Sequence, residues 1–247
     1  MSSSSRLRPS LVAAISLFER PHHQRIARVL SALNGPMLRA NRCWFAGGTA
    51  LALRFGEFRE SVDIDFCVSD VAGYRTLREL LAGAGGIKPI LGPGGMVRQV
   101  RELRADQYGL RTMLDVDGFE IKFEIIREAR IELDDPDEDS GICGVATLGR
   151  LDMAATKLLA NSDRWADDGT FSRDVIDLAM MRPGRALLNK STMKAEVAYG
   201  SSVDADLTRA IEQLGRREGR LERCISALGM TVPLALLWQR LRAIRPR

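Results

Sequence analysis

The spacing of apolar residues divides the chain into three parts. Helical spacing, with apolar neighbours three and four positions apart, runs through residues 6–40, where Pro21 marks a helix start. Short strand-like runs mixed with helices follow, and from about residue 148 the spacing is helical to the end. We therefore predict an N-terminal helical segment (1–42), a mixed core (43–147) and a C-terminal helical domain (148–247).

The middle part carries the strands. Strict alternation of apolar and polar residues over 61–69 is typical of a half-buried strand, and Val116-Asp117-Gly118 is typical of a hairpin turn. The predicted order is a strand at 43–47, a helix ending at Gly56, a strand at 61–69, a helix at 71–86, and strands at 96–104, 108–116 and 119–133, with no strand afterwards. The predicted helices of the last part are roughly 148–163, 171–182, 184–198, 203–217, 219–228 and 233–245. Together they predict an α+β fold, a mixed β-sheet core with flanking helices followed by a C-terminal helical bundle.

Composition narrows the class of protein. Of the 247 residues, 45% are hydrophobic, enough for a sizeable core, and no apolar run is long enough to cross a membrane. The four cysteines are scattered without a CxxC pair, which argues against a zinc site and a disulfide framework. We expect reduced thiols, no membrane partner and a cytoplasmic location.

Charge is unevenly distributed. The net charge is +4, but residues 214–247 hold eight arginines against Glu218 and Glu222. A solvated helix face and a phosphate-contacting surface explain this cluster about equally well, and we predict weak contact with RNA through Arg240, Arg242 and Arg245. The acidic run at 132–139 is interpreted as a solvated loop.

Asp63 and Asp65 sit in an otherwise apolar strand. Alternate strand residues face the same side, so these two carboxylates project together while Val62, Ile64 and Phe66 point to the core. Like charges so placed repel unless a cation lies between them. Mg²⁺ or Mn²⁺ meets that need with hard oxygen ligands.

A third acid is available on the strand beginning at residue 119. Glu120, Lys122 and Glu124 share its polar face. If this strand neighbours the Asp63–Asp65 strand, Glu124 or Glu120 completes the metal site, and we prefer Glu124 because it lies deeper in the strand.

Gly47-Gly48-Thr49 joins a strand end to a helix start. Glycines allow close approach of backbone amides, and amides at a helix N-terminus bind phosphate. A phosphate site beside a carboxylate metal site is the arrangement used for phosphoryl transfer. Helix spacing also places the Lys157 stem along apolar surface, and from the residues alone a surface-exposed ammonium is favoured over one that reaches a cleft. The same spacing places Asp174 and Asp177 on one helix face.

The stretches "AGGTALALRFG" and "RESVDIDF" resemble the nucleotidyltransferase superfamily, and more narrowly the AbiEii/AbiGii-type toxin nucleotidyltransferases. The segment "AATKLLANSDRWADDGTFSRDVIDLAMM" matches their later helical pair. It supplies Lys157, Arg164, Arg173, Asp174 and Asp177 in order. The resemblance covers about 43–182. Two departures stand out: Phe58 replaces a common His, and Glu124 replaces the usual Asp.

The resemblance implies a nucleotidyltransferase-like core that moves an NMP from an NTP to an acceptor hydroxyl, on a tRNA 3′ end or a protein, and releases pyrophosphate. It implies a toxin of a toxin–antitoxin or phage-defence system, with a cognate antitoxin as partner. The alternatives are a catalytically silent nucleotide- or partner-binding protein of this fold and a small-molecule, antibiotic-modifying enzyme.

It also implies roles for individual residues. The implied catalytic residues are Asp63, Asp65, Glu124, Lys157 and Asp174, and the first three of these hold the metal. The implied nucleotide-binding residues are Gly47, Gly48, Thr49, Ser61 and Lys157. His22 and His23 are expected to have surface or capping roles.

Overall fold

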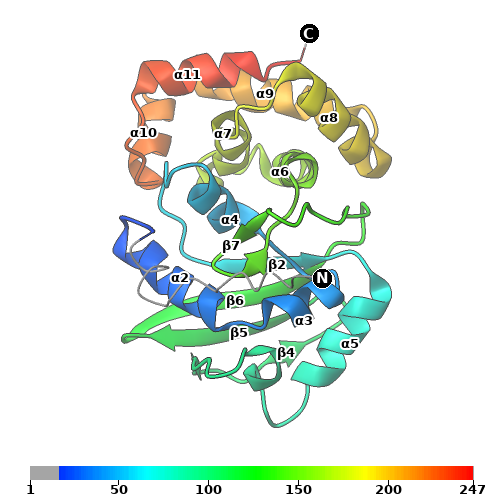
Figure 1. Ribbon diagram of the computed structural model, residues 1–247. Coiled ribbons are helices and arrows are strands. Elements are labelled where there is room, and N and C mark those ends of the chain that lie inside the picture. The colour runs from blue at the N-terminus through cyan, green and yellow to red at the C-terminus, as the bar shows by residue number, and fades with distance from the viewer. Residues whose placement is uncertain (1–16, 247) are drawn as a thin grey trace, which may run out of the picture.

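The computed structural model describes residues 17–246. Figure 1 shows a sheet in the lower half of the molecule and the helices after residue 150 gathered above it. This arrangement confirms the predicted α+β class. The expected helix before Pro21 falls mostly on residues outside the described range.

The main sheet is mixed, with the strand order β1-β2-β6-β5-β3 and β4 beside β5. β2 runs antiparallel to β1 and parallel to β6, and β5 and β6 form a hairpin. Asp117 and Gly118 make its two-residue turn with φ of 55° and 81°, as such turns require. The strands are β1 (Trp44–Ala46), β2 (Ile64–Val68), β3 (Arg98–Gln99), β4 (Arg104–Ala105), β5 (Gly109–Val116) and β6 (Phe119–Arg127).

Several predictions about strands were wrong. In place of the strand expected at 96–104 there are only the two-residue strands β3 and β4, and β6 ends at Arg127 rather than at residue 133. β2 begins at Ile64 rather than residue 61, because β1 has only three residues and β6 pairing starts opposite Ile64. Asp63 therefore lies in the preceding loop, and Val62 is 48% exposed instead of buried. A small hairpin of β7 (Gly141–Ile142) and β8 (Val145–Ala146) also follows the region where strands were expected to end.

The helices in the first part of the chain lie beside the sheet. They are α2 (Pro21–Ala32), α3 (Gly35–Ala40), α4 (Gly47–Arg54), α5 (Val71–Leu81) and the 3₁₀ turn η1 (Lys88–Ile90). Side chains cap two of them: Asn34 accepts from the Met37 amide and Asp70 from the Gly73 amide. α4 begins directly where β1 ends and contacts both β2 and the later helices, so it links the two layers (Figure 1).

The C-terminal helices match the prediction closely. They are α6 (Arg150–Arg164), η2 (Asp168–Thr170), α7 (Arg173–Met180), α8 (Arg185–Tyr199), α9 (Ser202–Arg216), α10 (Arg220–Ala227) and α11 (Leu234–Ala243). α6 contacts α7, α8 and α9 and is the central element of this layer. No helix among residues 17–246 is long and apolar enough to cross a membrane.

Three phenylalanines from neighbouring strands fix the face that each strand buries. The rings of Phe45, Phe66 and Phe123 are fully buried, with centroids 5.5 and 5.7 Å apart in succession. Because strand side chains alternate, burial of Phe66 and Phe123 turns Asp65 and Glu124 to the opposite face. The core packing of β2 and β6 thus places two acids together.

Candidate active site

A cleft of about 490 Å³ lies between the sheet and the C-terminal helices. Its floor carries Asp63, Asp65 and Glu124, and its opposite wall carries Lys157, Arg164 and Arg173. Gly47, Gly48 and Ser61 line it as well. Thr49 and Asp174 lie behind the surface of the cleft. The other seven of the nine predicted site residues line it: Gly47, Gly48, Ser61, Asp63, Asp65, Glu124 and Lys157.

Asp65 and Glu124 are direct neighbours across two parallel strands, being Cα partners in the β2–β6 register. Glu120 lies opposite Asp115 toward the hairpin end and pairs with Arg101 at 3.2 Å. The register therefore places Glu124, rather than Glu120, beside Asp65.

The environment of Asp65 favours its neutral form. Burial, together with the charges of Asp63 and Glu124, raises the pKa of Asp65 to about 6. Neither the Asp63 nor the Asp65 carboxylate has a hydrogen-bond or ion-pair partner among residues 17–246. A bound cation would offset this repulsion.

Glu124 differs from the two aspartates because both its oxygens are already bound. Arg111 Nε lies 2.9 Å from Oε1, and Lys122 Nζ lies 2.7 Å from Oε2. Its role as a metal ligand stays a prediction.

The residues present fit a divalent cation through two ligands rather than three. In the described part of the chain, no group of three or more His, Cys, Asp or Glu side chains is placed to hold a metal ion. Asp63 and Asp65 nevertheless offer partnerless carboxylates in the cleft. One or two carboxylates, completed by water and substrate phosphate oxygens, are the usual protein ligands of Mg²⁺.

Gly47 and Gly48 are required by their surroundings. Gly47 has a φ of +72°, and a Cβ there would lie 2.4 Å from Asp65 Oδ2. A Cβ at Gly48 would lie 2.1 Å from Arg59 Nη2. Both residues line the cleft at the start of α4, where backbone amides are available to a phosphate.

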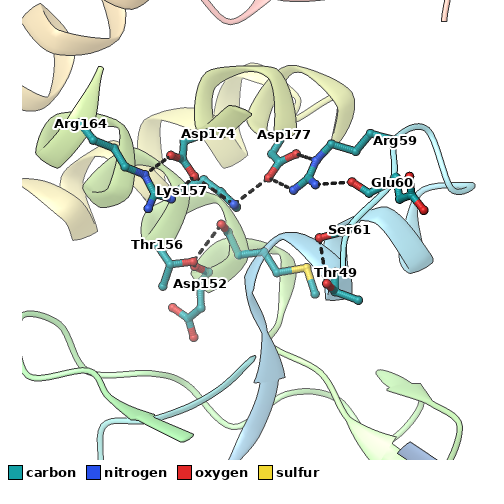
Figure 2. A network of polar contacts seen from close by, with 11 residues as sticks. Thr49, Arg59, Glu60, Ser61, Asp152, Thr156, Lys157, Arg164, Asp174 and Asp177 are labelled. Carbon is teal, nitrogen blue, oxygen red and sulfur yellow. Dashed lines mark hydrogen bonds and ion pairs between the residues drawn. The ribbon is translucent and has the colours of Figure 1, made fainter. Parts of the chain in front are cut away.

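Thr49 braces the loop that carries Asp63. Its hydroxyl oxygen lies 2.8 Å from Ser61 Oγ (Figure 2) and 2.5 Å from the Asp63 carbonyl oxygen. Thr49 is 1% exposed and does not line the cleft. These contacts indicate support of the loop, whereas Ser61 itself faces the cleft.

Behind the basic wall lies a buried chain of ion pairs, shown in Figure 2. Lys157 Nζ lies 3.0 Å from Asp174 Oδ1 and 2.6 Å from Asp177 Oδ2. Arg164 also binds Asp174, at 2.6 Å. Burial acts to raise the pKa of Asp174, but Lys157 and Arg164 hold that pKa well below its usual range. Asp174 therefore orients two cations of the wall instead of facing the cleft itself.

Arg59 completes this chain and was not identified from the sequence as a site residue. Its Nε and Nη2 bind Asp177 at 2.6 and 2.9 Å, and its Nη1 binds the Glu60 carbonyl oxygen. Its position two residues before Ser61, in the segment that carries the aspartates, was the available signal. Arg59 thereby ties the loop before β2 to α7, while Arg173 lines the cleft with no partner among the described residues.

The prediction of a surface or capping role for His23 was wrong. The side chain is fully buried, with Nδ1 2.7 Å from Glu57 Oε1, and its Nε2 accepts the Ser61 amide at 3.2 Å. Nothing in the local pattern of α2 indicates this contact, because its partners lie more than thirty residues away.

Comparison with known proteins identifies a family that the sequence matches. A family model described as nucleotidyl transferase AbiEii toxin, type IV toxin–antitoxin system, matches residues 28–222. No curated protein matches the chain at a significant level. Two crystal structures from Helicobacter pylori, a candidate nucleotidyltransferase and JHP933, each share 16% identity and a TM-score of 0.49 with it. Those alignments cover 90% of this chain and 92% and 90% of the respective structures.

Proposed function

Since the chain belongs to the AbiEii family of toxin nucleotidyltransferases, we propose that its cleft transfers an NMP from an NTP to an acceptor hydroxyl with the help of a divalent metal ion. The observation that carries this proposal is the pair of partnerless aspartates, Asp63 and Asp65, facing a basic wall across one cleft. Acids that bind a metal and cations that bind phosphates are the two halves of a phosphoryl-transfer site.

Asp63 and Asp65 would hold Mg²⁺ or Mn²⁺. When bound, the ion supplies charge neutralisation for the phosphoryl group under attack. Glu124 completes the acid set and, fixed by Arg111 and Lys122, helps to activate the acceptor hydroxyl.

The triphosphate would lie between the start of α4 and the basic wall. Gly47 and Gly48 offer backbone amides there, and Ser61 offers a hydroxyl. Lys157 steadies the triphosphate together with Arg164 and Arg173. In the buried chain, Arg59, Lys157 and Arg164 oppose only two carboxylates, so the wall keeps a positive charge for an anionic ligand.

The acceptor is proposed to be a tRNA 3′ end or a protein hydroxyl. The type IV toxin–antitoxin family suggests a cognate antitoxin that counters this activity. RNA contact is proposed for Arg240 and Arg242, which have no carboxylate partner within residues 17–246. Arg245, by contrast, is already paired with Glu212 at 2.7 Å.

Labelling with each of the four NTPs tests the proposal. The full chain is incubated with Mg²⁺ and with total tRNA, cell protein or an aminoglycoside. We expect label in tRNA or protein, complete loss with EDTA, and at least a hundredfold loss in Asp63→Asn and Asp65→Asn. Glu120→Gln, on the same strand face as Glu124 but outside the cleft lining, is the matched control and keeps the activity.

The alternatives give different results. Label in the aminoglycoside alone would identify a small-molecule enzyme. NTP binding without label in any acceptor would identify a catalytically silent protein and would contradict the proposal.

A further inference from the structure

We propose that His23, held by Glu57, is a positioning residue that fixes the loop carrying Asp63 for metal binding. The inference rests on the proposed function, since it assigns a second layer of support to that site. His23 and its anchor at the start of α2 precede residue 28, where the family match begins.

The contacts of His23 define a single protonation form. Its Nε2 accepts the Ser61 amide, so the ring hydrogen resides on Nδ1 and is donated to Glu57 Oε1. Burial lowers the pKa of His23, against the opposing effect of Glu57, and Arg20 and His22 lower it further. In this form the imidazole joins the Glu57 carboxylate to the Ser61 backbone amide.

Glu57 is itself anchored from several directions. Its carboxylate accepts the backbone amides of Glu19 at 2.7 Å and Arg20 at 3.1 Å. Arg20 Nε also donates to the Glu57 carbonyl oxygen at 3.2 Å. With a φ of +50°, Glu57 holds a backbone conformation that an L-residue adopts only when its surroundings impose it. The start of α2 thus fixes Glu57, and Glu57 fixes His23.

The support continues from Ser61 to Asp63 through Thr49. His23 holds the Ser61 amide, and the Thr49 hydroxyl joins the Ser61 side chain to the Asp63 carbonyl oxygen. The loop before β2 is therefore clamped from α2 on one side and from α4 on the other. Asp63 lies outside the sheet ladder, so these clamps take the place of strand pairing in setting its position.

This arrangement matters because a ligand carboxylate must be held in place before the metal arrives. Residues behind the ligands typically account for a ten- to hundredfold effect on metal affinity. Loss of the His23 bonds leaves the Asp63 carboxylate present but its backbone less constrained. We expect weaker metal binding without a change of ligand.

The experiment compares Mn²⁺ affinity, measured by electron paramagnetic resonance, in two isosteric variants of the full chain. His23→Met fills the site but makes neither hydrogen bond, and we expect at least a tenfold loss of affinity. His23→Gln supplies an N–H and a carbonyl at similar reach, and we expect recovery to within about threefold of the parent. Hydrogen exchange of the amides at 61–63 rises in His23→Met and returns in His23→Gln.

A control separates positioning from general stability. Val29→Ala removes buried volume from the same helix without touching the loop, so it lowers the melting temperature and leaves Mn²⁺ affinity unchanged. If His23→Met does not fold, Glu57→Gln serves instead, with an expected loss of about threefold.

The outcomes distinguish this inference from the proposed function. If Asp63→Asn itself leaves Mn²⁺ affinity unchanged, the metal site and the proposed function are wrong. If Asp63→Asn loses Mn²⁺ while His23→Met behaves like Val29→Ala, only the positioning role is rejected. Equal losses in His23→Met and His23→Gln would also reject it, since the hydrogen bonds would then be irrelevant.

Discussion

The ionised carboxylate of Asp65 lowers the stability of the folded protein. Its pKa is about 6 in the folded protein against an ordinary value of 3.8, so the native state binds the proton more tightly than the unfolded chain. Stability therefore falls as the pH rises from about 4 through 6, and the full penalty is present above that range. A residue that destabilises the empty protein at neutral pH is expected where a cation is needed to complete the site.

Replacement of Asp65 tests this cost directly. Asp65→Asn removes the charge, and we expect the free energy of unfolding to rise by roughly 1 to 3 kcal/mol at pH 8 without metal. The gain shrinks markedly at pH 4.5, where Asp65 is protonated in the folded parent. Urea denaturation at the two pH values measures it, and an equal effect at both would contradict the electrostatic cause.

Asp177 has the opposite effect on stability. It is fully buried between Arg59 and Lys157, which lower its pKa against the effect of burial. Asp177→Ala leaves both cations in the interior with one fewer partner, and we expect a loss of about 3 to 5 kcal/mol. Chemical denaturation checks this value, with Glu120→Gln as an exposed control. A loss below about 1 kcal/mol would show that the cations find other partners.

At the scale of elements, the helices were predictable and the short strands were not. Long amphipathic helices such as α6 and α9 are predictable because the helical spacing of apolar residues repeats over several turns. β2 illustrates the limit, because its start depends on where its neighbours β1 and β6 end. The hairpin β7–β8 has strands of two residues, too short to show any alternation.

Some residues of the candidate site were likewise predictable from the sequence and others were not. Asp63, Asp65, Glu124 and Lys157 were found because motif spacing and strand alternation are local in the sequence. His23 was missed, and Thr49 was assigned to the nucleotide, because their partners are set by tertiary packing. The sequence therefore predicted which groups line the cleft better than it predicted which groups hold them in place.

The start of α4 offers a test at this scale. Gly48→Ala places a methyl group against Arg59 Nη2, so the guanidinium must shift away from Asp177. We expect a loss of about 1 to 3 kcal/mol of stability together with weaker NTP binding. Gly184→Ala is the matched control, since it precedes α8 with a φ of −65° and open space at its Cβ. Equal behaviour of the two variants, by denaturation and calorimetry, would argue against a role for the Arg59 contact.

At the scale of the whole molecule, the C-terminal helices complete the cleft. Ala227 and Leu228 line it although they lie beyond residue 222, where the family match ends. The Leu228 carbonyl oxygen accepts the Glu60 amide at 3.0 Å, and the Gly229 carbonyl oxygen accepts from Arg20 Nη2 at 2.8 Å. The turn after α10 is thus bound to the same loop that carries Asp63.

The outer face of these helices carries the charge proposed to meet RNA. α11 lies at the top of the molecule in Figure 1, far from α5 at the lower right. Burial and the nearby charge of Arg182 lower the pKa of Arg240. Neither arginine has a carboxylate partner within residues 17–246. Arg242 is exposed and stacks on Trp238 at 5.3 Å. Arginines without carboxylate partners are available to contact a phosphate backbone, which favours the RNA-contacting interpretation over a merely solvated helix face.

Charge-reversal variants at two sites distinguish direct arginine–phosphate contact from the long-range effect of net charge on tRNA binding. Arg240→Glu with Arg242→Glu removes two proposed phosphate contacts, so we expect weaker tRNA binding. The slope of the logarithm of the binding constant against the logarithm of the salt concentration should become shallower by about two. Arg75→Glu with Arg78→Glu makes the same change in net charge on exposed positions of α5 and leaves the slope unchanged. Fluorescence titration at several salt concentrations measures both. If the two double variants weaken binding equally and share one slope, long-range attraction alone accounts for the effect, and the C-terminal arginines make no contact.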